Sequence, residues 1–187
     1  MGTVLLGMLV GGCSGGNRHF WRDNRNRLIV AGPMIGPYDS LTDLSPDLCE
    51  KVMEFPGARA GHDRPGQEYC GAVYQRNFEA PFYASFPSNS SSPVPIAGRK
   101  KNCDPVDGVQ DAAATRINIY ADYHSPPGKT MFSEDDLKLK NQPYYVRVQF
   151  NPYCEVYLYE VQTRTVFQLR DGRFVQVKKV AHDDLGF

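Results

Sequence analysis

The chain has 187 residues, the size of one domain with a short extension, and its 21 basic residues balance its 21 acidic residues. This balance argues against a nucleic-acid-binding protein and against a polybasic membrane-surface protein, because both need a net positive field. Hydrophobic residues make up 41% of the chain, and the 11 Tyr and 10 Phe favour strands, so we expect a folded domain with a real core.

The chain begins with a short apolar leader that ends at a cysteine. The apolar run Val4–Val10 is followed by Gly11, Gly12 and Cys13. Seven residues span only about 10 Å as a helix, far less than the roughly 30 Å hydrocarbon core of a bilayer, so the run does not predict a transmembrane helix. An apolar centre followed by small residues is typical of a signal peptide. The alternative is a buried N-terminal strand with an incidental cysteine.

The segment Val10-Gly11-Gly12-Cys13 resembles the bacterial lipoprotein box, in which the Cys thiol is lipidated and the chain is cut just before it. The resemblance implies a signal peptide over residues 1–12 and a lipid on Cys13. It also implies export to the bacterial envelope or periplasm, with the lipid as the membrane anchor. We interpret residues 13–44, rich in Gly, Asn, Arg and Pro, as a tether and irregular arm, and residues 45–187 as the folded domain.

The first predicted element of the domain is a helix. Ser45 followed by Pro46 is typical of a helix start, with Ser45 as the N-cap, and the helix should end at about Glu54. A second, short helix is predicted at residues 133–138, with Ser133 as its N-cap and acidic residues in its first turn.

Seven segments are rich in β-branched and aromatic residues and are bounded by turn residues, as strands should be. Residues 87–108 predict a long loop between the second and third strands, and Asp171-Gly172 predicts a hairpin between the last two. We therefore predict an α+β fold with a mixed, mostly antiparallel sheet of six or seven strands and two or three helices. The predicted strands are Glu68–Tyr74, Ala80–Phe86, Thr115–Tyr123, Tyr144–Phe150, Glu155–Val161, Thr165–Leu169 and Phe174–Val180.

Four cysteines remain in the domain: Cys49, Cys70, Cys103 and Cys154. An even number of cysteines in an exported chain predicts up to two disulfides, and three pairings are open. The alternative is a set of four reduced, buried thiols. No C-x-x-C spacing occurs, so the sequence does not support a zinc ribbon or a thioredoxin-type site.

Four residues whose side chains could take part in catalysis or metal binding occur in order along the domain: Glu68, His124, Ser133 and Asp136. An imidazole nitrogen and a carboxylate oxygen are good zinc ligands, and a second carboxylate near bound water can act as a general base. A hydroxyl nearby could donate a hydrogen bond to a developing oxyanion. Each residue also has a structural interpretation: a turn for His124, an N-cap for Ser133, helix-dipole contact for Asp136 and a solvent-facing strand position for Glu68.

The motifs around these residues resemble the JAMM (MPN, Mov34-type) metallopeptidase family. They are Glu-Tyr-Cys-Gly-Ala-Val-Tyr, Ala-Asp-Tyr-His-Ser-Pro-Pro and Phe-Ser-Glu-Asp-Asp-Leu. The family pattern is a Glu, then His-Ser/Thr-His-Pro, then Ser-x-x-Asp. The similarity covers about residues 65–180 and is greatest to JAB-like domains of unknown function from bacterial secreted and polymorphic-toxin proteins.

The resemblance implies a zinc site with assigned roles. Glu68 matches the general base, His124 the first zinc ligand, Ser133 the oxyanion-stabilising residue and Asp136 the third ligand. The second histidine ligand of the family falls on Pro126, which has no donor atom in its side chain. A zinc site is therefore predicted to be incomplete.

Asp122 is the candidate replacement for the missing ligand, because residues two apart on a strand share a face and Asp122 would lie beside His124. We expect Glu68, His124, Ser133 and Asp136 to converge on one side of the sheet even if catalysis has been lost.

These observations give several hypotheses about function. The first is an exported lipoprotein whose degenerate JAMM-like domain is a binding or structural module, with a protein or peptide partner. The second is a divergent zinc-dependent peptidase or isopeptidase that uses the four residues above. A purely structural envelope protein is the third, and a Cys70 nucleophile served by His124 is a minor alternative.

Overall fold

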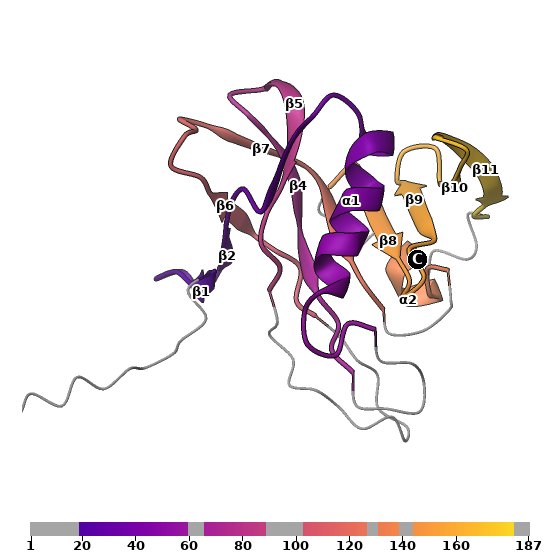
Figure 1. Cartoon of the computed structure of the whole chain (residues 1–187), viewed down its shortest axis with the longest axis horizontal. Helices are drawn as coiled ribbons and strands as arrows, with labels where there is room; N and C mark the ends of the chain where they lie inside the picture. Colours follow the sequence, from indigo (N-terminus) through magenta and orange to yellow (C-terminus); the bar gives the residue numbers. More distant parts are fainter. Residues whose placement is uncertain (1–18, 60–65, 89–102, 127–130, 139–143, 182–187) are drawn as a thin grey trace, which may run out of the picture.

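The computed structural model describes residues 19–59, 66–88, 103–126, 131–138 and 144–181 (Figure 1). The leader, Cys13 and most of the long loop predicted at 87–108 lie outside these residues. None of the described helices is long and apolar enough to cross a membrane.

The fold is mostly β. The described residues form eleven strands in two sheets, with one helix of thirteen residues and one of a single turn. The large sheet has the order β11-β10-β9-β8-β7-β4-β5-β3, and the small sheet has the order β1-β2-β6. The bounds are β1 Phe20–Arg22, β2 Leu28–Ala31, β3 Ile35–Tyr38, α1 Leu41–Met53, β4 Cys70–Arg76, β5 Glu79–Ala84, β6 Gly108–Gln110, β7 Ile117–His124, α2 Glu134–Leu137, β8 Val146–Phe150, β9 Val156–Glu160, β10 Thr165–Arg170 and β11 Arg173–Lys179.

The predicted α+β class is therefore wrong, although all seven predicted strands are present. The prediction missed β1, β2, β3 and β6, which have three or four residues each and are too short to show an alternating pattern. Three of them pair with segments distant in the sequence: β2 pairs with β6 in parallel, and β3 pairs with β5, while β1 pairs with β2. The large sheet also has one parallel pair, β7 with β8, and its other pairs are antiparallel.

The described part of segment 13–44 carries β1, β2, β3 and the first residues of α1, where the sequence predicted an irregular arm. The predicted helix start was also too late. Ser40, not Ser45, is the N-cap, and its hydroxyl accepts a hydrogen bond from the backbone of Asp43 at 3.1 Å. Pro46 consequently lies inside α1, and the helix tolerates it because Leu44 and Leu48 are fully buried on either side.

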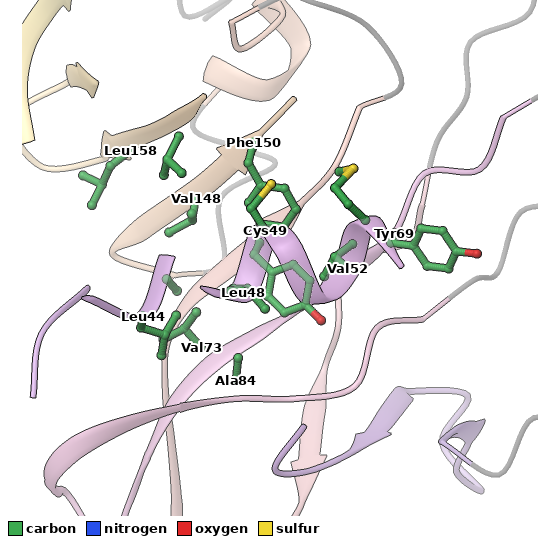
Figure 2. Close-up of a cluster of buried hydrophobic side chains, with 14 of the residues drawn as sticks. Leu44, Leu48, Cys49, Val52, Tyr69, Val73, Ala84, Val148, Phe150 and Leu158 are labelled. Carbon is green, nitrogen blue, oxygen red and sulfur yellow. The ribbon is translucent and has the colours of Figure 1, made fainter. Parts of the chain in front are cut away.

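One face of the large sheet packs against α1. Figure 2 shows Leu44, Leu48 and Val52 of the helix directed towards apolar side chains of the sheet. Val148 and Phe150 of β8 belong to this core and are fully buried. This face holds the largest group of buried apolar side chains in the described structure.

The opposite face of the large sheet is covered by two smaller elements. The small sheet packs over Ala72 and Ile119, which lie on β4 and β7. Leu137 of the short helix α2 and Phe132, which precedes the helix, pack against Tyr157 and Tyr159 of β9. Polar residues of β7 and β8 lie on this face, and they form the candidate site described below.

Two disulfides join the domain, which confirms the prediction of up to two and excludes the interpretation of four reduced thiols. Cys49 of α1 is bonded to Cys154 after β8, and Cys70 of β4 is bonded to Cys103. The first pair ties α1 to the sheet across a sequence separation of 105 residues. Cys70 is thereby removed as a free nucleophile.

We predict that the Cys49–Cys154 bond contributes more to stability than the Cys70–Cys103 bond, because it closes a loop of 105 residues and the second closes one of 33. Replacing Cys49 and Cys154 together with alanine should lower the free energy of unfolding in urea by about 2–5 kcal/mol. The matched control replaces Cys70 and Cys103 and should cost less. Equal losses, or four alkylated cysteines in the unreduced domain by intact mass, would contradict this prediction.

Candidate functional site

The candidate site is a row of polar side chains on β7 and β8. The two strands pair in parallel, with Asp122 opposite Arg147 and His124 opposite Gln149. Alternate residues such as Tyr123 point into the core beneath α1, so these four point to the other face. All four are buried, with exposed fractions of 6% or less. The expectation that Asp122 and His124 share a face is confirmed.

Arg147 lies at the centre of this row and joins two carboxylates. Its Nε and Nη2 atoms lie 2.8 and 2.7 Å from Oδ2 of Asp122. Its Nη1 lies 3.5 Å from Oδ1 of Asp136 and donates to the Asp136 backbone carbonyl at 3.3 Å. Because the exposed fraction of the Arg147 and Asp122 side chains is below a tenth, water screens this ion pair little.

Asp136 reaches the row from α2, where it also caps the helix. The Ser133 hydroxyl and backbone N–H donate to Oδ2 of Asp136 at 2.6 and 2.9 Å, and the Asp136 backbone donates to the Ser133 hydroxyl at 3.3 Å. This reciprocal arrangement is a capping box. It favours the structural interpretation of Ser133, which is exposed and whose hydroxyl is bonded to Asp136. Oδ1 of Asp136 faces His124 at 3.8 Å from Nε2, beyond hydrogen-bond distance.

His124 is buried as a neutral imidazole. Burial is the largest cause that lowers its pKa, and the Arg147 guanidinium lowers it further. The Asp136 and Asp122 carboxylates and a hydrogen bond with the Gln149 side chain act in the opposite direction and are outweighed. Its ring also packs against Phe132, with centroids 5.8 Å apart. Nε2 of His124 and Oδ1 of Asp122 are buried and make no hydrogen bond with the described residues.

Glu68 lies two residues before β4, near the end of the row. Its exposed fraction is 8%, so it is not the solvent-facing residue of the structural interpretation. The following residue, Tyr69, exchanges two hydrogen bonds with Ser125, the residue after His124. The structure therefore joins Asp122 and Asp136 through Arg147, places His124 beside Asp136, and puts Glu68 near the same end of β7. The catalytic roles of these residues stay predictions.

Arg147 is the site residue that the sequence analysis missed. The signal was present in the strand Val-Arg-Val-Gln-Phe, where apolar residues alternate with Arg147 and Gln149. Alternation of this kind usually means a solvated face, but β8 is buried on both faces. A charged residue there needs a partner of opposite charge, and only the register with β7 identifies Asp122 as that partner.

Comparison with known proteins does not place the chain: no family model, no curated protein and no solved structure matches it. Among the described residues, no three His, Cys, Asp or Glu side chains are grouped so that they could hold a metal ion.

We predict that His124 makes stability fall at mildly acidic pH. Its pKa in the folded state lies below the value of about 6.5 expected when unfolded, so the unfolded chain takes up a proton first as the pH drops. Unfolding free energy should be unaffected by this group above about pH 7 and should fall between about pH 6.5 and 5, by at most about 1.4 kcal/mol per pH unit.

The measurement is urea unfolding at several pH values for the native chain and for His124→Gln. The variant should lose the extra slope between pH 6.5 and 5, a window above the range in which carboxylates titrate. Parallel slopes for the two proteins would show that His124 is not held neutral.

Proposed function

We propose that this chain is an exported, lipid-anchored protein of the bacterial envelope, whose JAMM-like domain binds a protein or peptide partner and no longer hydrolyses one. The observation that carries the proposal is the position of Arg147. Its guanidinium contacts Asp136, which the family resemblance offers as a metal ligand, and Asp122, the candidate replacement for the missing ligand.

A guanidinium in this position does not fit a zinc site. It already neutralises the carboxylate charge that a divalent cation would neutralise, and two cations a few ångströms apart repel strongly in a buried site. Pro126 gives no ligand at the position of the second family histidine. With Asp122 and Asp136 engaged by Arg147, His124 is the one candidate ligand that is not paired with the guanidinium, and structural or catalytic zinc needs three or four ligands. No hydrolytic step is therefore assigned to this site.

Export is supported by a different part of the molecule. Disulfides form and persist in oxidising compartments, and this domain has two. In this proposal the apolar leader directs export, and the lipid on Cys13 anchors the exported protein to the membrane.

We predict that the full chain, purified without chelators, contains far less than one zinc ion per chain by elemental analysis. Arg147→Gln leaves the carboxylates of Asp122 and Asp136 beside His124, so this variant should bind zinc more tightly than the native chain. Circular dichroism checks that the variant folds. One zinc ion per native chain, together with chelator-sensitive hydrolysis of a peptide or isopeptide, would overturn the proposal whether or not the variant folds.

We predict that Cys13→Ser moves the protein, expressed in a bacterium, from the membrane fraction to the soluble fraction. The thioether to the lipid can form only on the cysteine sulfur. Ser14→Ala is the matched control and should leave the protein with the membranes. If Cys13→Ser fractionates like the native protein, the lipid anchor is wrong.

A further inference from the structure

An open hollow lies where the β10–β11 hairpin meets the turn after β9. Its volume is about 640 Å³, within the range of roughly 300–1,000 Å³ that is usual for ligand sites. The lining residues are Gln162, Thr163, Arg164, Lys179, Val180 and Ala181. None of them belongs to the polar row around Arg147.

The hollow is positively charged. Arg164 and Lys179 are its two charged lining residues, and neither side chain forms an ion pair or hydrogen bond with the described part of the chain. The nearby carboxylate of Glu160 does not line the hollow and accepts a hydrogen bond from the Thr163 hydroxyl. Two cations that share one concave surface raise the local potential and favour an anionic occupant.

The backbone around the hollow is well fixed. The Val180 N–H donates to the Arg164 carbonyl at 2.9 Å, and Thr165 lies opposite Lys179 in the hairpin. The Thr165 hydroxyl donates to the Thr163 carbonyl at 3.1 Å. Val180 is 3% exposed and packs in the apolar cluster under α2. These contacts fix the backbone that carries Arg164 and Lys179, so binding has to order their side chains but not their backbone.

We propose that this hollow binds an acidic peptide segment of a protein partner, with a carboxylate on Arg164 and Lys179. The guanidinium of arginine matches a carboxylate with two parallel hydrogen bonds, and lysine adds a second positive charge. A single inorganic anion would fill only a small part of the volume. The exposed Ala181 gives a small apolar surface beside the charges, which suits a peptide that carries both an acid and an apolar side chain. The proposal rests on the proposed function only in taking a protein as the partner.

The test uses the full chain and a fluorescently labelled hexapeptide of alternating Asp and Leu, with both ends blocked, in a fluorescence anisotropy titration. The control peptide has Asn in place of Asp. We expect Arg164→Gln, and separately Lys179→Gln, to weaken binding of the Asp peptide by about tenfold or more, the usual range for a lost charge-assisted hydrogen bond. Arg173→Gln is the matched control, since Arg173 is exposed at the far end of the same hairpin, and it should change affinity less than twofold.

Several results would overturn the proposal. Equal binding of the Asp and Asn peptides would exclude carboxylate recognition, and equal effects of Arg164→Gln and Arg173→Gln would reduce it to general surface charge. Inorganic phosphate that binds without the peptide would mean a small-anion site. If Asp183→Asn with Asp184→Asn strengthens peptide binding, the chain's own C-terminal segment is the occupant. The zinc and fractionation results do not involve Arg164, so this proposal can fail while the proposed function stands.

Discussion

The centre of the large sheet is covered on both faces, and this double coverage determines which side chains β7 and β8 can carry. On one face α1 requires apolar residues, and Ala121, Tyr123, Val148 and Phe150 meet that requirement. The other face is closed by the small sheet and α2, yet it holds a guanidinium. A buried charge without a partner would cost several kcal/mol, so Arg147 is compatible with this fold only because carboxylates lie on both sides of it.

The position of α2 depends on the same charge. A helix of four residues has no stability of its own, because nucleating a helix costs more than one turn returns. It is held by the burial of Phe132 and Leu137 and by Asp136, which caps the helix with one carboxylate oxygen and faces Arg147 with the other. A metal ligand needs a carboxylate oxygen that is available to the ion. In Asp136, Oδ2 accepts hydrogen bonds from Ser133 and Oδ1 faces Arg147, so a metal would have to displace one of these contacts.

The sequence predicted the longer strands and part of the site, but it did not predict the short strands or the role of Arg147. The strands from β4 onward, apart from β6, show alternation or aromatic enrichment over five residues or more, and Asp171-Gly172 adopts the left-handed conformations that a tight hairpin needs. By contrast, β6 has three residues and is defined by its pairing with β2, a long-range contact that leaves no local pattern. The motif order placed His124 and Asp136 together correctly, since they lie 3.8 Å apart. It could not reveal Arg147, because a motif comparison looks for the expected ligands and not for a new cation between them.

The polar row and the basic hollow are linked through one residue, Tyr159 of β9. Tyr159 of β9 stands opposite Arg147 in the β8–β9 register, and its hydroxyl donates to the Leu137 carbonyl of α2 at 3.4 Å. Burial raises the pKa of Tyr159, and the Arg164 guanidinium of the hollow partly offsets that effect, so Arg164 acts on the same phenol. Tyr159 therefore forms a hydrogen bond with α2, which contributes Asp136 to the row, and its pKa is affected by the Arg164 charge of the hollow. An anion that neutralised Arg164 would remove that offset and make the Tyr159 phenol harder to ionise, while the buried pair of Arg147 with Asp122 would keep its own compensation. The ion pair of Arg147 with Asp122 is buried and does not include Arg164, so a ligand on the hollow that we propose would leave the charge balance between β7, β8 and α2 in place.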